Sequence, residues 1–271
     1  MDISELKRTA LNIRRKTVIS AHKTGACHIG GSLSTVEILT VLYYGVMRTD
    51  PLNPDWGERD RFILSKGHGA IALYCILADK GFIPESELDR IKKIGSLLQG
   101  HPVKAIPGIE MSSGSLGQGI SFAAGKAFSL KHSGSPSRVF VLVGDGELQE
   151  GQNWEALPLA AKLKLGNLTV IVDRNKLQLD DTVENVLDCN NFEDKFRAFN
   201  WDTETVNGHS IDALESVLSG TGNGKPRAVI ADTVKGKGVS FMENAVSWHA
   251  GAMSDEQLAL ALKELASETE R

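Results

Sequence analysis

Two segments place oxygen-bearing side chains directly after short apolar runs. Asp145 follows the run 138–143, and Asn175 follows the run 168–173. If these runs are neighbouring parallel strands, both side chains can meet outside the strands' carboxyl ends, where such sheets bind ligands. One carboxylate, one amide and a nearby backbone carbonyl suit Mg²⁺, which prefers oxygen ligands and often binds phosphates as well. The pattern therefore predicts a magnesium–diphosphate site.

Glycines flank the proposed metal ligand, at Gly144 and Gly146. Glycine lets the main chain approach a diphosphate closely. The alternative for Gly-Asp-Gly alone is a tight strand-to-helix turn with Asp145 as the cap. The second polar strand end favours the ligand site.

A glycine cluster at residues 114–119 precedes an expected helix. Backbone amides at a helix N-terminus can bind an anion or another ligand, but small residues also permit close helix packing. The spacing is not GxGxxG after a strand, which disfavours a nucleotide-binding dehydrogenase.

Four of the seven histidines lie in loops beside glycine or other small residues, next to expected helix starts; they are His28, His68, His101 and His249. Their spacing is not HxxxH, so a zinc site is not expected. Clustered neutral imidazoles suit proton transfer and hydrogen bonding to a polyhydroxylated substrate. For any one of them a structural role is the alternative. The other three have weaker contexts, and His209 is expected to help start a helix.

The elements that must position these groups alternate between helices and apolar strands. Strands are expected over residues 61–65, 138–143, 168–173, 201–206 and 227–234. Helices are expected from residue 2 to about 24, over 35–44, and from the end of Gly67-His68-Gly69 through residue 77. Further helices are expected over 85–94, 116–130, 152–164, 192–199 and 211–218, and from residue 254 onward. Residues 26–34 are expected to form a turn and 95–114 an ordered loop, and Pro158 suggests that the helix over 152–164 starts late. We therefore expect one α/β domain over residues 1–271, with a parallel sheet sandwiched by helices.

Composition restricts the classes of function. The chain has 271 residues, 41% of them hydrophobic, and a net charge of −4, so no basic excess points to nucleic acid or to an anionic membrane. Apolar runs are shorter than the roughly 18 residues of a membrane span, and the acidic N-terminus is unlike a secretory signal. The cysteines Cys27, Cys75 and Cys189 lie far apart and are expected to be reduced thiols. We expect a cytoplasmic protein.

Several motifs together resemble one enzyme family. The segment GDGELQEGQNWEA followed by VDRNKLQLD is similar to the thiamine-diphosphate motif that begins with GDG and ends in Asn about thirty residues later. Further segments are HIGGSLS, FILSKGHG, GHPVKAIPGIEMSSGSLGQGIS and DTVKGKGVSF. From about His22 onward the chain resembles the N-terminal, diphosphate-binding (PP-type) domain of transketolase.

This resemblance implies a set of metal and cofactor ligands. Asp145, the Asn175 side chain and the Leu177 carbonyl would hold Mg²⁺, or Ca²⁺ or Mn²⁺ in its place, and Gly144 and Gly146 would approach the diphosphate of thiamine diphosphate. Gly114 and Leu116 would line the cofactor cleft.

The resemblance also implies roles in catalysis. His68 and His249 would contact cofactor and substrate, whereas His28 and His101 would bind the sugar hydroxyls and assist proton transfer. Glu150 and Glu155 would join a carboxylate network across a subunit interface. Arg174 departs from the usual Asn or Asp before the ligand Asn; it could pair with a phosphate or a carboxylate, or point away.

In this family a second, pyrimidine-binding domain supplies the carboxylate that contacts the aminopyrimidine ring, and that domain is not found in this sequence. We therefore expect the N-terminal subunit of a split transketolase, in an α2β2 complex with a C-terminal subunit that carries the pyrimidine-binding domain. The expected reaction is transfer of a two-carbon ketol unit between sugar phosphates, as in pentose-phosphate metabolism. The alternatives are an unusual ketose, such as a sulfo-sugar or branched sugar phosphate, and a non-catalytic cofactor-binding scaffold.

Overall fold

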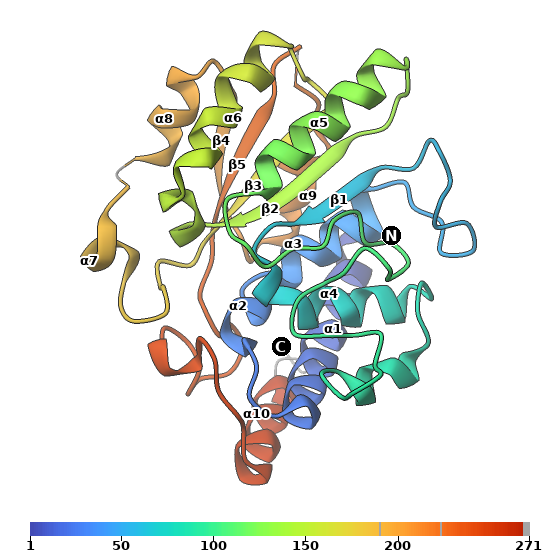
Figure 1. Ribbon diagram of the computed structural model, residues 1–271. Coiled ribbons are helices and arrows are strands. Elements are labelled where there is room, and N and C mark those ends of the chain that lie inside the picture. Colours follow the sequence, from blue (N-terminus) through green and yellow to red (C-terminus); the bar gives the residue numbers. More distant parts are fainter. Residues whose placement is uncertain (190, 223, 268–271) are drawn as a thin grey trace.

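Parallel strands form a central sheet in the computed structural model, which describes residues 1–189, 191–222 and 224–267 (Figure 1). Within these residues the strands are β1 (Arg61–Leu64), β2 (Val139–Gly144), β3 (Leu168–Arg174), β4 (Asp202–Asn207) and β5 (Arg227–Asp232). They lie in the order β1-β2-β3-β5-β4. The register pairs Gly144 at the end of β2 with Asp173 of β3, so β2 and β3 are neighbours, as the metal-site prediction requires.

Helices pack on both faces of the sheet. The α-helices of the described residues are α1 (Ile3–Thr24), α2 (Ile29–Leu33), α3 (Val36–Thr40), α4 (Ala70–Asp79), α5 (Gly119–His132), α6 (Gly151–Lys162), α7 (Val183–Leu187), α8 (Phe192–Ala198), α9 (Ile211–Ser219) and α10 (Asp255–Ser267). Short 3₁₀ segments occur at Gly67–Gly69, Glu85–Arg90, Gly146–Gln149 and Val246–Trp248, and a π-helical turn at Val41–Val46.

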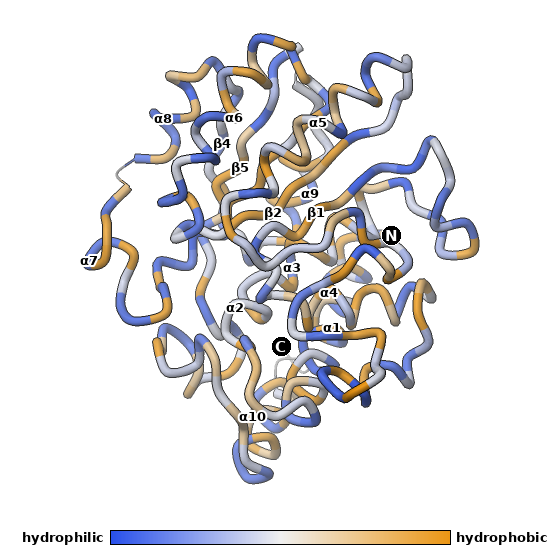
Figure 2. The backbone as a smooth tube through the Cα atoms, in the orientation of Figure 1, coloured by the Kyte–Doolittle hydropathy of each residue, from blue (hydrophilic) through white to orange (hydrophobic). Residues whose placement is uncertain are grey.

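Alternate residues of β1, β2, β3 and β5 enter two separate hydrophobic cores. In β2, Phe140 and Leu142 pack with α1 to α4 and α9, whereas Val141 and Val143 pack with α5, α6 and α8. This period of two is the side-chain alternation of a strand buried on both faces. Figure 2 shows the resulting hydrophobic colour along the central strands. The expected parallel sheet sandwiched by helices is confirmed.

Local capping interactions account for helix ends that lie close to the predicted positions. Asp2 and Glu5 form a capping box at the start of α1, and Gly25 ends that helix with φ 77°. At α10, Ser254 Oγ accepts the Gln257 N–H at 3.2 Å, while the Gln257 side chain accepts the Ser254 N–H at 2.9 Å.

The structure corrects the prediction around residues 26–44. Residues 29–33, expected to be a turn, form the short helix α2. The expected helix over 35–44 is divided into α3 and the π-helical turn Val41–Val46. Every residue of α2 is buried, so tertiary packing stabilises a helix whose two glycines disfavour it in isolation.

Two other helices also differ from expectation. α6 begins at Gly151, so its late start was wrong; it continues through Pro158 because the burial of Ala156, Leu157 and Ala160 offsets the lost backbone hydrogen bond. The expected helix over 85–94 is only the 3₁₀ turn Glu85–Arg90.

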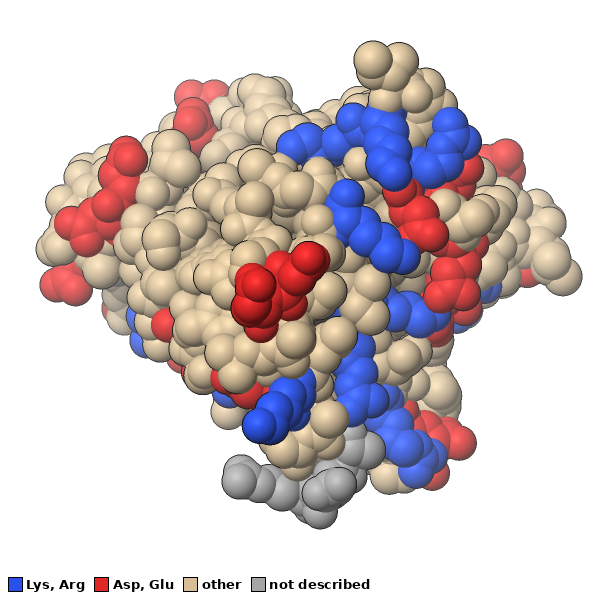
Figure 3. All heavy atoms as spheres, turned by 90° about the horizontal axis from the view of Figure 1, so that it is seen from below, with Lys and Arg blue, Asp and Glu red and all other residues tan. Residues whose placement is uncertain are grey.

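Charged side chains of both signs share the molecular surface. The face drawn in Figure 3 carries a band of Lys and Arg side chains bordered by Asp and Glu. Among the helices of the described residues, none is long and apolar enough to cross a bilayer.

Candidate functional site

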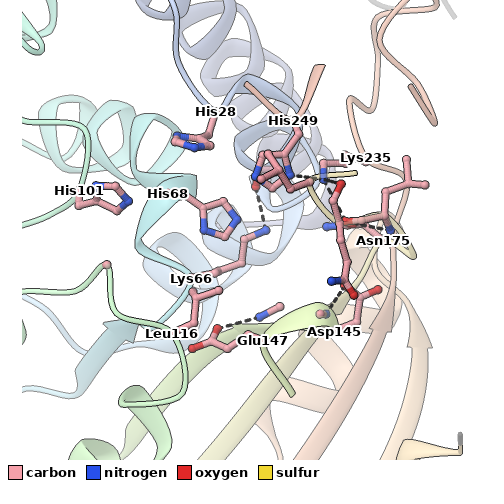
Figure 4. Close-up of a pocket in the computed structure, with 17 residues that line it drawn as sticks. His28, Lys66, His68, His101, Leu116, Asp145, Glu147, Asn175, Lys235 and His249 are labelled. Atoms are coloured by element: carbon pink, nitrogen blue, oxygen red, sulfur yellow. Dashed lines mark hydrogen bonds between the residues drawn. The ribbon is translucent and has the colours of Figure 1, made fainter. Parts of the chain in front are cut away.

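A cavity of about 300 Å³ opens at the carboxyl ends of β1, β2 and β3 (Figure 4). It contains eleven of the thirteen residues singled out from the sequence, namely His28, His68, His101, Gly114, Leu116, Gly144, Asp145, Gly146, Asn175, Leu177 and His249. Strand ends, helix starts and loops far apart in sequence therefore converge on one place. Glu150 and Glu155 do not line it.

Oxygen donors occupy one end of this cavity. Asp145 accepts the N–H groups of Gly146 and Lys176, at 2.8 and 2.6 Å. Asn175 donates its amide to Asp173 at 2.9 Å and accepts the Leu177 N–H at 3.2 Å. These bonds fix one carboxylate, one amide oxygen and the Leu177 carbonyl on the cavity wall. Within the described part of the chain, no three His, Cys, Asp or Glu side chains converge as an alternative metal site.

This donor set fits a hard divalent cation with a diphosphate beside it. The available ligands are oxygen atoms, as Mg²⁺ prefers. A Cβ on Gly146 would lie 3.0 Å from Gln178 Cγ. A side chain at this position would therefore crowd Gln178, whereas glycine leaves the cavity wall open there. Burial and the charge of Asp173 raise the pKa of Asp145 to about 6; a bound cation would favour the ionised form.

A buried ion pair lies beneath the oxygen donors. The Lys66 ammonium pairs with Asp173 and donates to the Gly31 carbonyl at 3.0 Å, and both charged side chains are almost fully buried. Ser34 and Thr233 also donate to the Asp173 carboxylate. Despite burial, the charge of Lys66 lowers the pKa of Asp173. The pair connects β3 to the turn after β1.

A second lysine, Lys235, lies at the same end of the cavity as the oxygen donors (Figure 4). Lys235 Nζ donates to the Leu177 carbonyl at 2.9 Å and contacts His249 Nδ1 at 2.7 Å. Burial, with the charge of Lys66, lowers the pKa of Lys235 to about 8. The hydrogen-bond partners of its ammonium are the Leu177 and Gln178 carbonyls and the His249 imidazole, so its positive charge is available to an anion that enters the cavity.

The four predicted histidines form one cluster. The His28 ring lies 5.4 Å from His68, 5.4 Å from His249 and 6.0 Å from His101, between ring centroids. A backbone bridge between Cys27 and Gly251 joins the segments of His28 and His249. Figure 4 shows His28, His68 and His101 together on one side and Asp145 and Asn175 on the other.

The environment favours the neutral form of three of these imidazoles, those of His28, His68 and His249. Burial, with the charge of Lys66, lowers the pKa of His68 to about 2, and burial, with the charge of Lys235, lowers the pKa of His249 to about 4. Burial also lowers the pKa of His28. A neutral imidazole can donate one hydrogen bond and accept another, which suits the hydroxyl groups of a sugar.

The glycine cluster at 114–119 has a different role from the anion site considered above. The Gly117 N–H donates to Glu147 Oε1 at 2.9 Å, and the Gly119 N–H donates to Ser65 Oγ at 3.1 Å. Ser65 itself donates to Glu147. These amides are therefore used within the protein, and the loop contributes Gly114 and Leu116 to the cavity wall instead.

The remaining predicted residues lie outside the cavity. Glu150 and Glu155 are exposed, and Glu155 lines a surface groove between α5 and α6. Arg174 makes a bidentate pair with Asp232, at 2.6 and 2.8 Å, and contacts Glu193 at 3.2 Å. Of the open alternatives, Arg174 pairs with carboxylates.

Sequence reasoning missed three charged residues of the cavity. Lys66 precedes Gly67-His68, Lys235 precedes Gly236, and Glu147 follows Gly146. The sequence signal that could have identified them is that each charged residue is adjacent to a glycine. Charged residues are mostly exposed, so their burial could not be predicted from pattern alone.

Residues 6–271 match the profile of a protein family described as the thiamine diphosphate binding domain of transketolase. The chain belongs to this transketolase family. A crystal structure of transketolase from Campylobacter jejuni superposes with a TM-score of 0.92 at 29% identity. The alignment covers 98% of this chain and 43% of that one, so the chain spans less than half of the full-length enzyme.

Relatives of similar length to this chain are named as transketolase subunits. An apulose-4-phosphate transketolase subunit of Actinobacillus succinogenes is 44% identical, over 99% of this chain and 98% of the relative. A Clostridium protein named 6-deoxy-6-sulfo-D-fructose transketolase subunit SqwG is 40% identical, over 97% of each. Human transketolase is 37% identical over 98% of this chain and 43% of its own length.

Proposed function

We propose that the chain is the N-terminal subunit of a two-chain transketolase, which transfers a two-carbon ketol unit from a ketose to an aldose with thiamine diphosphate. The observation that carries this proposal is the single cavity in which oxygen donors and a lysine lie at one end and the imidazoles of His28, His68 and His101 at the other. A non-catalytic scaffold would need the first end but not the second.

Asp145, the Asn175 side chain and the Leu177 carbonyl would hold the metal, with Mg²⁺ favoured by the all-oxygen set. Gly144 and Gly146 would admit the diphosphate, and the Lys235 ammonium would face its negative charge. When bound, the cofactor supplies the carbanion chemistry, and the protein supplies orientation and electrostatics.

The histidines would act on the sugar. His68 and His249 lie closest to the lysines and would contact cofactor and substrate together. His28 and His101 would hydrogen-bond the sugar hydroxyls and move protons at their ring nitrogens. Glu150 and Glu155, which are both exposed, would join a carboxylate network with a neighbouring protein chain.

The substrate is proposed to be a sugar phosphate or a related anionic sugar. Two relatives of 44% and 40% identity are named for apulose 4-phosphate and for 6-deoxy-6-sulfo-D-fructose, which favours an unusual ketose as the second candidate beside the pentose-phosphate sugars. The partner would be a C-terminal subunit with the pyrimidine-binding domain, in an α2β2 assembly, and residues 1–271 would act as one cofactor-binding domain.

A reconstitution assay tests the function. The chain alone, with thiamine diphosphate and Mg²⁺, is expected to show no ketol transfer from any donor. Addition of a pyrimidine-domain subunit should give turnover, and a donor panel of xylulose 5-phosphate, a branched ketose phosphate and sulfofructose should identify the substrate class. Full turnover without a partner would contradict the two-chain proposal, and absence of turnover for all three donors with a folded complex would contradict the ketol-transfer proposal.

A further inference from the structure

A buried polar cluster outside the cavity holds the segment that carries Lys235. Its members are Arg14 from α1, Glu37 from α3 and His209 from the turn before α9. The helices α1, α3 and α9 pack together on one side of the sheet (Figure 1). The cluster borders a separate surface hollow, and none of its members lines the cofactor cavity.

Glu37 connects the other two members. One carboxylate oxygen accepts from the Arg14 guanidinium, and the other lies 2.8 Å from His209 Nδ1. Burial opposes ionisation of Glu37, but the charge of Arg14 and the hydrogen bond from His209 lower its pKa to about 2. Glu37 is therefore a carboxylate that orients both a guanidinium and an imidazole.

Both oriented groups contact the backbone next to Lys235. The Val234 N–H donates to His209 Nε2 at 2.8 Å, and the Arg14 guanidinium donates to the Lys237 carbonyl. Since Nε2 accepts this bond, the proton of the neutral His209 ring lies on Nδ1, facing Glu37. The backbone is held one residue before Lys235 and two residues after it.

Glycines let the segment fit this closely. Gly238 has φ 88°, and a Cβ there would lie 2.6 Å from Arg14 Cδ. Gly236 has φ 79°, and its N–H donates to the Gly30 carbonyl at 3.0 Å. The segment 234–238 thus lies directly on Arg14, with little freedom to shift.

We propose that Arg14, Glu37 and His209 are positioning residues that, as one unit, hold the backbone on both sides of Lys235 and keep its ammonium group against Leu177 and His249 in the cavity. The link from this unit to cofactor affinity rests on the proposed function, whereas the link to the segment 234–238 does not. Sequence reasoning gave His209 only a role in starting a helix, so this role adds to that prediction.

Variants of His209 separate the two bonds of its ring. His209→Asn keeps a donor near Glu37 but leaves the Val234 N–H without an acceptor. His209→Gln can place an amide oxygen near Val234, and His209→Ala removes both contacts. The matched control is Lys7→Ala, which removes an exposed ion pair with Asp212 at the rim of the same hollow.

The first readout is amide hydrogen exchange of the full chain without cofactor. The amides of residues 234–238 should exchange faster in His209→Ala and His209→Asn, less so in His209→Gln, and not in Lys7→Ala, while the amides of β2 and β3 keep their protection. Equal loss of protection throughout the sheet would show a general stability role and overturn the proposal. If His209→Ala does not fold, the Asn and Gln variants decide.

The second readout is the affinity of the assembled two-chain enzyme for thiamine diphosphate with Mg²⁺. We expect His209→Ala and His209→Asn to weaken it about 10- to 100-fold, as is typical when the groups that orient a ligand-binding residue are removed, with little change in kcat at saturating cofactor. Unchanged affinity and unchanged exchange at 234–238 would overturn the proposal. Failure of the unmodified complex to bind thiamine diphosphate would instead contradict the proposed function.

Discussion

At the residue scale, the metal prediction depends on one carboxylate. Asp145 is the single charged ligand proposed, and its two hydrogen bonds to backbone N–H groups already hold it in place. Loss of a residue that only orients a metal ligand typically weakens metal binding by roughly 10- to 100-fold. Because Asp145 is proposed as a ligand itself, we expect Asp145→Ala to weaken Mg²⁺-dependent binding of thiamine diphosphate by more than that.

Calorimetric titration of the assembled enzyme checks this expectation, with Asp180→Ala as the control because Asp180 is exposed in the same loop. If Asp145→Ala binds the cofactor as tightly as the control variant, the metal assignment is wrong.

The histidines allow substrate handling to be separated from cofactor binding. His101 lies against Gly114, where an added Cβ would be 3.3 Å from its ring. We expect His101→Ala to lower kcat towards the range of ~10²–10⁴-fold typical of general acid–base groups. His28→Ala should mainly raise KM, by the roughly 0.5–1.5 kcal/mol of one hydrogen bond.

Steady-state kinetics at saturating cofactor measure both effects, with the exposed His132→Ala on α5 as the control. Cofactor affinity should stay nearly unchanged in both variants. Normal kcat and KM in both would mean that these histidines are structural.

At the element scale, the start of α5 requires glycine. A Cβ on Gly119 would lie 2.2 Å from Ser65 Oγ, whereas a Cβ on Gly125, in the same helix, meets nothing within 4 Å. We expect Gly119→Ala to lower the free energy of unfolding by about 1–3 kcal/mol through overpacking. Gly125→Ala should raise it by about 0.5–1 kcal/mol, because alanine loses less entropy in a helix.

Urea unfolding of the two variants decides between this steric account and simple helix propensity. Propensity alone predicts that both substitutions stabilise the chain, so an equal gain in the two would show that Ser65 can move away. The steric account further predicts that Gly119→Ala disturbs the Ser65–Glu147 contact and hence the 114–119 loop.

At the scale of the whole molecule, the buried histidines make stability depend on pH. The pKa values of His68 and His249 are lowered from 6.5 to about 2 and about 4 in the folded chain. The unfolded chain therefore binds more protons below about pH 6.5, so the stability present above that pH is lost as pH falls towards 4. Asp145, with its raised pKa of about 6, opposes this trend.

The free energy of unfolding of the chain without cofactor should thus be lower at pH 5 than at pH 7. Denaturant titrations at both pH values measure the difference, and His68→Gln should reduce it because one of the two responsible imidazoles is gone. A stability that is the same at both pH values, or a pH response that His68→Gln leaves unaltered, would contradict this account.

The sequence by itself determined the parallel sheet and most of the side chains that the structure brings together around the cavity. Continuous apolar runs identified β2 and β3. A strand that is buried on both faces has apolar side chains on both sides, so its sequence does not alternate between apolar and polar residues. Polar residues at their ends then predicted Asp145 and Asn175 at one edge, because parallel strands end on the same side of a sheet. Histidines beside glycine or other small residues indicated His28, His68, His101 and His249, and the family resemblance added Gly114, Leu116 and Leu177.

Only the tertiary structure decided where long side chains and weak helices lie. Lys235 and Lys66 resemble surface lysines in the sequence, and their burial depends on partners far along the chain, such as Leu177 and Asp173. α2 exists because its neighbours bury it, against the preference of its glycines. Sequence patterns report the local preference for helix or strand and the spacing of buried residues. The burial of these lysines and the formation of α2 depend instead on long-range contacts, whose energies exceed the local preferences.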